Sequence, residues 1–300
     1  TMFSIGGTMY HSIEPRAAIN LRLCDKASFK ASYTEMSQFM HLLSATYLNL
    51  PTDYWVPSTE RISPMRARQY AAGIYTKLPY GINFSIEGFY KTMNNLIEYD
   101  CSDGTLSPTA EQWENKVRTG KGKAYGMEAD ISFRKAQTSV EVSYTLSWNR
   151  RLFPDFHYTW YPDKFDNRHK LSINLSHKFN DRIEAYASWN YHSGNRITIP
   201  TQQTEAPVIP GTEQPNGYMM IYEAPNNISL PAYHRLDLGI NFHKITKRGL
   251  DRIWNISIYN AYCRKNPLYA TVEQKPDGTF IGKGHGIFPI IPSFSYTIKF

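Results

Sequence analysis

Apolar and polar residues alternate with a period of two in stretch after stretch of this 300-residue chain. In residues 293–300, for example, the even positions are apolar and the odd positions are Ser, Thr or Lys. Successive side chains of a β-strand point to opposite faces of the sheet, so each stretch predicts a strand with one apolar and one polar face. The pattern predicts an all-β protein of about eleven strands. They lie within residues 16–23, 27–33, 66–77, 82–90, 125–133, 138–150, 171–179, 183–191, 236–242, 254–258 and 290–300.

The connections between these strands alternate in length. Short turns are expected at residues 24–26, 78–81, 135–137, 180–182 and 244–251, and long loops at residues 34–65, 92–121, 150–166, 193–232 and 263–288. Several structureless loops of that length are unusual in a compact soluble domain. Antiparallel strands with short turns at one end and long loops at the other are typical of a transmembrane β-barrel of the outer-membrane type.

The composition excludes several other classes of protein. The chain has 22 Tyr, 15 Phe and 6 Trp, which is too many aromatic residues for a disordered protein. Its net charge of +7 is spread along the sequence and forms no basic stripe interleaved with aromatic residues, so nucleic acid is not an expected partner. No run of about 18 apolar residues predicts a membrane-spanning helix, and the first residues show no signal peptide.

No catalytic or metal-binding motif stands out. Cys24, Cys101 and Cys263 are far apart and form no CxxC or Cys/His cluster, so no metal site is expected. The chain has no GxSxG and no HExxH motif, and neither an enzyme nor a cofactor is predicted. Cys101 and Cys263 both fall in expected long loops, and whether they pair stays open.

The polar faces of the predicted strands carry most of their charged residues. In a barrel that face lines the lumen, whereas charges on the lipid face are costly. On the apolar face, His177 is the main ionisable residue between the strand ends, and aromatic residues near the ends predict interfacial girdles: Tyr90, Trp148, Trp189, Tyr191, Trp254 and Tyr296. The residues predicted to face the lumen are Glu87, Glu128, Asp130, Glu141, Arg235 and Asp237.

The chain ends in the sequence SFSYTIKF. Its apolar positions, at two-residue steps, are Phe294, Tyr296, Ile298 and Phe300. This ending resembles the C-terminal signal by which the barrel-assembly machinery recognises outer-membrane barrels for insertion. In such barrels the C-terminus lies on the periplasmic side, so the resemblance implies periplasmic short turns and extracellular long loops.

Several longer segments, in order and spacing, resemble the C-terminal part of Bacteroidetes TonB-dependent receptors: SIEPRAAINLRL, PTDYWVPSTERISPMRARQYAAGIY, SIEGFYKTMNNLIEYD, HRLDLGINFHK and IWNISIYNAYCRKNPLYA. The likeness covers nearly the whole chain. It implies an outer-membrane receptor that binds a scarce extracellular ligand and imports it to the periplasm, using energy delivered through TonB. It further implies a 22-stranded barrel closed around an N-terminal plug.

About eleven strands are roughly half of such a barrel. An open half-barrel leaves unpaired strand edges in lipid, at several kcal/mol for each unsatisfied backbone group. We therefore expect residues 1–300 to be the C-terminal portion of one outer-membrane β-barrel, with the plug, the TonB-binding region and the N-terminal strands outside this chain. The alternative is a smaller complete barrel with an even number of strands, which requires one more strand near residues 2–10.

Partners and ligand contacts follow from this interpretation. Basic residues near the extracellular strand ends are candidates to bind the phosphates of lipopolysaccharide: Lys91, Arg150, Arg151, Arg168 and Arg264. Aromatic residues of the long loops are candidates for ligand contact, because rings give a large contact area: Tyr54, Trp55, Trp113, Trp160, Tyr161, Tyr218 and Tyr222. By analogy with the family, a surface lipoprotein is a further possible partner.

Three functions remain open at this point. The first is an energised importer, as the resemblance implies. The second is a passive, porin-like channel, which lacks a plug and conducts without TonB. The third is a soluble all-β binding module such as a lectin sandwich, which stays in the aqueous fraction without detergent. The imported ligand is not readable from the sequence.

Overall fold

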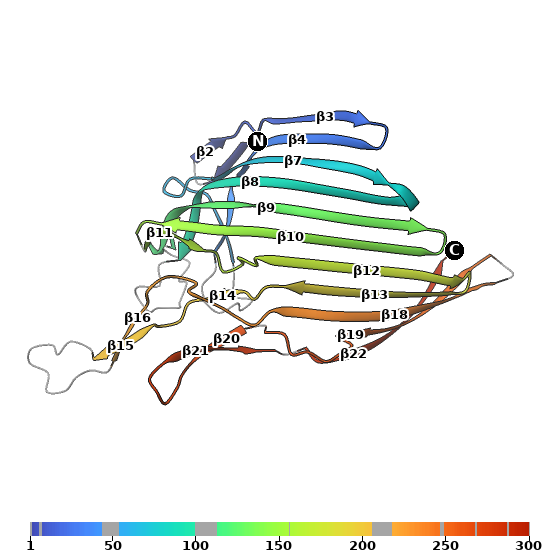
Figure 1. Cartoon of the computed structure of the whole chain (residues 1–300). Helices are drawn as coiled ribbons and strands as arrows, with labels where there is room; N and C mark the ends of the chain where they lie inside the picture. The colour runs from blue at the N-terminus through green and yellow to red at the C-terminus, as the bar shows by residue number, and fades with distance from the viewer. Residues whose placement is uncertain are drawn as a thin grey trace, which may run out of the picture.

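A computed structural model describes residues 2–5, 8–43, 54–99, 113–155, 157–205, 218–246, 249–267, 269–286 and 288–299 of the chain. Its main feature is one antiparallel sheet of eleven long strands, here called the wall, which curves as it passes from the first strand to the last (Figure 1). The wall strands are β3 (Arg16–Cys24), β4 (Ala27–Gln38), β7 (Met65–Leu78), β8 (Ile82–Tyr99), β9 (Val117–Lys135), β10 (Thr138–Phe153), β12 (His169–Asn180), β13 (Ile183–His192), β18 (Tyr233–Ile245), β19 (Asp251–Tyr259) and β22 (Ile291–Lys299).

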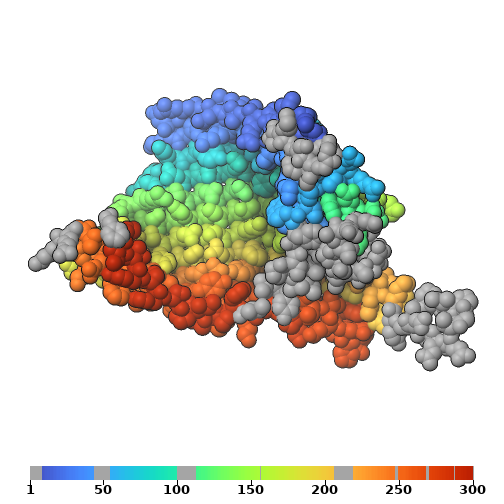
Figure 2. Space-filling view, turned by 180° about the vertical axis from the view of Figure 1, so that it is seen from behind, coloured from blue at the N-terminus to red at the C-terminus, as the bar shows by residue number. Residues whose placement is uncertain are grey.

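The wall strands follow one another in chain order, each paired antiparallel with the next. Figure 2 shows the same order from behind, as a run of colours from blue to red along the wall. The outermost strands, β3 and β22, pair with one neighbour each, and every residue in both is exposed. The predicted all-β class, the antiparallel arrangement and the strand number are confirmed, and the described residues form an open sheet.

Short turns join the wall strands at one end, called the turn end. In the turn between β7 and β8, the backbone of Tyr80 and Gly81 has φ angles of 64° and 80°. This left-handed region costs glycine little, and here Tyr80 adopts it as well. The 3₁₀ turn η1 (Pro79–Gly81) forms this connection. At the same end of the wall, Lys299 of β22 pairs with Asp251 of β19. The structure thus places the five expected short turns on one side of the sheet (Figure 1).

The opposite end, called the loop end, holds shorter strands, several of which extend beyond the ends of the wall strands (Figure 1). Most of them form two-stranded hairpins, whereas β11 adds to β10. These strands are β5 (Met40–Leu43), β6 (Tyr54–Pro57), β11 (His157–Pro162), β14 (Arg196–Ile197), β15 (Gln202–Glu205), β16 (Tyr218–Ile221), β17 (Ile228–Ser229), β20 (Tyr269–Gln274) and β21 (Phe280–His285). The 3₁₀ turn η3 (Trp113–Lys116) precedes β9.

The predicted long loops were too long, because strands occupy much of them. Residues 92–121 were expected to form a loop, but β8 continues to Tyr99 and β9 begins at Val117. A bulge explains the error: the register shifts between Asn94 and Leu96, and Asn95 has a φ of 58°. An extra residue in one strand reverses the face of every following side chain, so the period of two is interrupted while the strand continues.

The N-terminal residues do not add a strand to the wall. β1 (Met2–Ile5) and β2 (Thr8–His11) pair only with each other among the described residues. The strand that a smaller, even-numbered barrel requires near residues 2–10 is therefore not found in the described sheet. Among the described residues, no helix is both long and apolar enough to cross a membrane.

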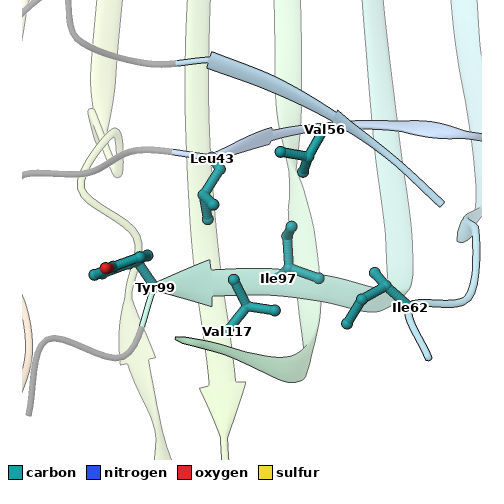
Figure 3. Packing of buried hydrophobic residues seen from close by; sticks show 6 residues of the cluster. All are labelled: Leu43, Val56, Ile62, Ile97, Tyr99 and Val117. Atoms are coloured by element: carbon teal, nitrogen blue, oxygen red, sulfur yellow. The ribbon is translucent and has the colours of Figure 1, made fainter. Parts of the chain in front are cut away.

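The buried hydrophobic side chains gather at the loop end. In one cluster, Ile97 of β8 and Val117 of β9 point toward Leu43 of β5 and Val56 of β6 (Figure 3). A second cluster joins β14, β17 and β20, and a third joins the ends of β8 and β10 to β11. Of the buried hydrophobic residues that the structure describes, only Ala71 lies along the middle of a wall strand. The described core therefore lies between the loop-end tips of the wall strands and the shorter strands beyond them.

Candidate functional site at the loop end and on the two faces of the wall

The strand register assigns every wall residue to one of two faces, because directly paired residues of neighbouring strands point to the same side. Glu87 pairs with Glu128, and Glu128 pairs with Thr145. Glu141 pairs with Asn174 of β12, Asn174 pairs with Ser188 of β13, and Ser188 pairs with Asp237 of β18. The even-numbered residues of β13 and the odd-numbered residues of β18 therefore lie on the same face as Glu141. All six residues predicted to face a lumen thus lie on one side, called the polar face: Glu87, Glu128, Asp130, Glu141, Arg235 and Asp237. That this face lines a lumen stays a prediction.

In the first half of the wall the polar face is strongly charged. The Tyr75 hydroxyl donates a 2.7 Å hydrogen bond to Glu87, and the Lys30 ammonium lies 4.1 Å from the centroid of the Tyr75 ring. Near the turn end, Lys30, Tyr75 and Asp130 line a hollow of about 500 Å³. Its other charged lining residues are Arg22, Asp25, Lys26 and Lys77. This surface is suited to bind a polar, charged segment.

In the second half of the wall the charged residues of the polar face lie toward the strand ends, and the middle of this face is uncharged. A ladder of side-chain hydrogen bonds crosses β12 and β13, in which Ser188 donates to Asn174 (2.8 Å) and Ser172 donates to Asn190 (3.0 Å). The ladder resumes on β19, where Asn255 donates to Asn241 (2.7 Å). These amides and hydroxyls satisfy one another, which allows a polar surface without fixed charge.

Arg235 and Asp237 form a compact cluster on the polar face near the loop end. The Arg235 guanidinium donates to Asp237 and, through one nitrogen, to the hydroxyls of Tyr233 and Tyr259, each at 2.9 Å. It also lies 4.2 Å from the centroid of the Tyr259 ring. Asp237 accepts the backbone N–H of Asn260, so the cluster fixes the start of the connection after β19.

A buried ionic cluster ties β8, β10 and β11 together at the loop end. Arg151 donates a short hydrogen bond to Asp163, whose side chain is only 2% exposed. The same guanidinium lies 3.9 Å from Glu98, which accepts a 3.0 Å hydrogen bond from the Tyr161 hydroxyl. Asp163 also accepts the backbone N–H of Phe165. Each carboxylate therefore has a cationic or hydrogen-bonding partner, as buried charges require.

Burial shifts the protonation of this cluster. It raises the pKa of Glu98 above its usual value, although Arg151 and the Tyr161 hydroxyl act in the opposite direction. Burial also raises the pKa of Tyr161, and the Glu98 charge adds to that effect. Burial alone lowers the pKa of Arg151, but Asp163 and Glu98 outweigh it and raise the pKa. Arg151 therefore stays charged, and Glu98 takes up a proton at a higher pH than an exposed glutamate does.

Asp166 organises a second set of contacts beside the first. Its side chain is only 1% exposed. It accepts a 2.7 Å hydrogen bond from the backbone N–H of Asn149 and a 3.1 Å hydrogen bond from the Arg168 guanidinium. Arg196, from β14, lies 3.6 Å away. Asp163, Asp166 and Arg196 were not expected from the sequence, because their roles depend on loop segments that meet only in the folded protein.

The aromatic residues predicted to contact ligand do not gather in one place. Trp55 and Tyr222 are exposed by 58% and 56%. Trp113 packs against the cluster of β5, β6, β8 and β9, and the Trp160 ring lies 4.2 Å from the Lys123 ammonium. Tyr161 is a correction: it is 2% exposed and fills the space beside Phe153, so it does not offer a ring to a ligand. The side chains of Tyr54 and Tyr218 lie outside the described part of the structure.

The structure also corrects the candidate phosphate-binding residues. Lys91 pairs with Gln69 and Ala124 on the polar face, and Arg151 is held in the buried ionic cluster. Arg264 donates to the carbonyl of Ala232 and to Asn266. Arg168 contacts Asp166 and lies 4.7 Å over the Trp148 ring. Only Arg150 lies on the apolar face without such a contact among the described residues.

The apolar face exposes large hydrophobic side chains over its full width. Those of the C-terminal strand include Phe294, Tyr296 and Ile298, exposed by 62%, 42% and 39%. Phe300, the last residue of the predicted insertion signal, lies outside the described residues. His177, the exception on this face, shares a 2.8 Å hydrogen bond with Thr138 and packs its ring against Phe179. Such an apolar surface marks contact with a membrane or another protein.

Cys24 and Cys263 are exposed free thiols, whereas Cys101 lies outside the described residues, so the structure does not test the pairing of Cys101 with Cys263. Across the described ranges, no group of three or more His, Cys, Asp and Glu side chains is arranged to hold a metal ion.

Comparisons with known proteins agree on one family. A family model described as TonB dependent receptor-like, beta-barrel, matches residues 6–261. The chain resembles the ferripyoverdine receptor of the outer membrane of Pseudomonas aeruginosa, with a TM-score of 0.55 and 19% identity over 97% of this chain and 33% of that chain. It resembles the ferric yersiniabactin uptake receptor from Yersinia pestis, with a TM-score of 0.56 and 12% identity over 95% of this chain and 37% of that chain.

A third similar structure is the ferric preacinetobactin receptor from Acinetobacter baumannii, with a TM-score of 0.53 and 13% identity over 97% of this chain and 37% of that chain. No curated protein matches the chain. At these identities the likeness shows the fold, and the chain spans about a third of the length of these relatives.

Proposed function

Because this chain belongs to the TonB-dependent receptor family, as part of its β-barrel, we propose that it is one wall of an energised importer. The complete receptor binds a scarce ligand outside the cell and moves it to the periplasm with energy delivered through TonB. Barrels of this family are integral outer-membrane proteins, so the soluble binding module is set aside. The Bacteroidetes branch suggested by the sequence resemblance is part of the proposal.

The observation that carries the proposal is the division of the wall into two faces. One face exposes large hydrophobic side chains, and the other carries charges, amides and hydroxyls. A wall of this kind is stable where lipid covers the first face and a polar interior covers the second. With eleven wall strands and two exposed edges, we propose that further strands and a plug complete the barrel.

The charged half of the polar face supports the proposed contact with a plug. Asp130 lines the hollow at the turn end together with Lys30 and Arg22. Glu87, which pairs with Glu128, lines a neighbouring hollow with Lys30. A plug segment with complementary charges would pair with these groups, whereas an empty pore would leave them to water. The uncharged middle of the second half, with its ladder of Asn and Ser side chains, is a suitable surface for a polar solute to pass.

We place ligand capture at the loop end. Its buried ionic and hydrophobic clusters hold the loops in defined positions, and exposed rings such as Trp55 and Tyr222 remain available for contact. The similar solved structures include receptors for ferripyoverdine, ferric yersiniabactin and ferric preacinetobactin. Ferric siderophores are therefore the first ligands to test, and a surface lipoprotein is a further proposed partner.

Uptake measurements test the proposal. Cells with and without the native gene are first compared for uptake of a panel of radioiron-loaded siderophores and of cobalamin, to find the ligand that depends on this receptor. Uptake of that ligand is then measured after deletion of TonB. Loss of uptake supports an energised importer, and unchanged uptake identifies the second candidate, a passive channel.

The size of the native polypeptide provides a second test. An antibody against the C-terminal strand β22 detects the protein in isolated outer membranes. We expect a band at least roughly twice the 34.6 kDa of this chain, because a 22-stranded barrel with a plug requires it. A band near 34.6 kDa would contradict the proposal of a plugged receptor.

A further inference from the structure

On the apolar face near the loop end, aromatic residues line up in a single row across neighbouring strands. Tyr70 of β7 pairs with Tyr90 of β8, Tyr90 pairs with Tyr125 of β9, and Tyr125 pairs with Trp148 of β10. The rings are in contact: the centroids of Tyr90 and Tyr125 are 6.3 Å apart, and those of Tyr125 and Trp148 are 5.4 Å apart. Tyr33 of β4 extends the row, with its centroid 5.0 Å from that of Tyr70. Tyr and Trp favour the boundary between hydrocarbon and headgroups, so this row marks the edge of the membrane.

Two residues farther toward the loop end, the next row on the same face is basic. Arg68 pairs with Thr92, Thr92 pairs with Lys123, and Lys123 pairs with Arg150. The row after that contains Arg66 and Lys121, separated by Asn94. A two-residue step along a strand is about 6.6 Å, so five cations lie within about 15 Å beyond the aromatic row. This is the depth at which lipid headgroups lie.

Most of these cations have no carboxylate partner. Arg68 forms a 3.1 Å ion pair with Glu35, and the Lys123 ammonium lies over the Trp160 ring. Within the described ranges, Arg66, Lys121 and Arg150 have no ion pair with an acidic side chain. The five residues therefore present an excess of positive charge that faces outward beside the membrane.

The basic patch is confined to one part of the wall. On β13, β18 and β19 the last paired apolar-face residues toward the loop end are Tyr191, His234 and Ile258. The loop-end halves of these three strands place no Lys or Arg on that face. A general adaptation to an anionic membrane surface would spread cations over every strand. The concentration on β7, β9 and β10 instead indicates a discrete binding site.

We propose that Arg66, Arg68, Lys121, Lys123 and Arg150 bind the phosphate groups of a glycolipid of the outer leaflet, while the aromatic row contacts its sugar and acyl chains. Guanidinium groups bind phosphate oxygens through paired, charge-assisted hydrogen bonds, and lysine adds a compact positive charge. The inference rests on the proposed function for its orientation, with the loop end outside the cell. It names a site on the outside of the barrel, away from the surface that the imported ligand crosses.

The test uses the complete receptor, purified from outer membranes in detergent and stripped of bound lipid. Its affinity for lipopolysaccharide is compared with that of a triple variant, Arg68→Gln, Lys123→Gln and Arg150→Gln. The matched control is Lys91→Gln, Lys170→Gln and Lys178→Gln, which removes the same charge from the polar face. We expect the first variant to bind at least about tenfold more weakly and the control to bind as the unchanged receptor does.

A second measurement needs no substitution and therefore does not depend on folding of the variants. Lipopolysaccharide from which the phosphates have been removed should bind the unchanged receptor as weakly as intact lipopolysaccharide binds the triple variant. Equal binding of intact and phosphate-free glycolipid would overturn the proposal. So would displacement of intact lipopolysaccharide by inorganic phosphate alone at millimolar concentration, which would indicate a site for free phosphate.

Uptake by the same triple variant separates this inference from the proposed function. Lost glycolipid binding with retained TonB-dependent uptake supports both proposals. Retained glycolipid binding in the triple variant overturns the inference, whatever the uptake measurement shows. Uptake that does not depend on TonB overturns the proposed importer function. The glycolipid proposal is then judged by the binding measurements alone.

Discussion

The wall and the loop end of this molecule follow opposite rules of burial. Along the wall, large hydrophobic side chains such as Ile74, Leu175 and Phe294 point outward and are 45%, 41% and 62% exposed. At the loop end, Leu43 and Phe153 are 1% and 0% exposed, and the charges of Arg151 and Asp163 are turned inward and paired. The loop end resembles a soluble protein, and the wall does not.

The difference shows that the two regions fold against different solvents. Water surrounds the loop end, so its stability comes from burial of apolar groups and from satisfied buried charges. The wall gains nothing by hiding its apolar face if that face meets lipid, and its stability there comes from backbone hydrogen bonds that lipid cannot replace. The substitutions below are chosen to give different results in the two regions.

The largest effect is expected at the loop end, from Phe153→Ala. The ring is fully buried against Leu96 and Tyr161, and a Cβ on Gly120 would lie 2.6 Å from it, so the strands pack tightly around this side chain. Removing it should lower the local stability of β8, β10 and β11 by about 3–5 kcal/mol. Hydrogen exchange of the loop-end amides in the complete receptor measures the loss. Tyr158→Ala, at a residue 89% exposed, is the control and should change protection by less than about 0.5 kcal/mol.

A smaller effect is expected on the wall from Leu175→Arg. Leu175 lies near the middle of β12 on the apolar face, where an arginine in lipid costs about 2–4 kcal/mol. Ser176→Arg, one residue away on the polar face, should cost much less. Denaturant unfolding in lipid vesicles compares the two variants. Equal losses in both would show that lipid does not distinguish the faces.

The aromatic row marks the boundary between the two regions, and Tyr125→Leu tests its contribution. Leucine keeps an apolar side chain but loses the stacking on Tyr90 and Trp148, so a loss of about 1 kcal/mol in the free energy of unfolding is expected. The control is Tyr80→Leu, in an exposed turn at the opposite end of the wall, with an expected change below about 0.5 kcal/mol. A larger loss of unfolding free energy in Tyr80→Leu than in Tyr125→Leu would contradict the assignment of the aromatic row as the boundary.

The smallest effect concerns pH at the loop end. Burial raises the pKa of Glu98, so the folded state binds this proton more tightly than the unfolded chain does. The resulting stabilisation is complete below the pKa of the unfolded chain and is lost as pH rises through the raised pKa of the folded state. Loop-end protection, corrected for intrinsic exchange, should therefore fall across that range. Glu98→Gln, which does not titrate, should flatten the curve, and an unchanged pH profile in this variant would contradict the assignment.

The sequence was sufficient for the wall because its signal is local. A period of two, read from stretches such as residues 138–150, predicts the strands and assigns Glu87, Glu128 and Asp237 to the polar face without knowledge of the partner strands. The same rule failed beyond Asn94, since one bulged residue reverses the faces while the strand continues to Tyr99. Lys91 and Arg151 were misjudged for a separate reason: they were grouped by their place near the strand ends instead of by the face on which they lie.

The loop end was not predictable for a different reason. Its contacts join residues far apart in the chain, such as Tyr161 with Glu98 and Arg196 with Asp166, and no local pattern indicates these pairs. Tyr90 and Trp148 were predicted as girdle residues, but Tyr70 and Tyr125 of the same transverse row were missed, because a row across strands requires the register of each pair. Register depends on turn geometry and bulges, which the residue pattern alone does not specify.

The most direct test of the central claim measures which face of the wall touches lipid. Single cysteines at each position from 171 to 178 on β12 are introduced into the complete receptor, after its native cysteines have been replaced by serine, and are labelled with a fluorophore in lipid vesicles. A quencher carried on the lipid chains should reduce fluorescence at the odd positions, which include Leu171, Ile173 and Leu175, and leave the even positions bright. Equal quenching at both sets of positions, or stronger quenching at the even positions, would contradict a wall with one face in lipid and one in the barrel interior.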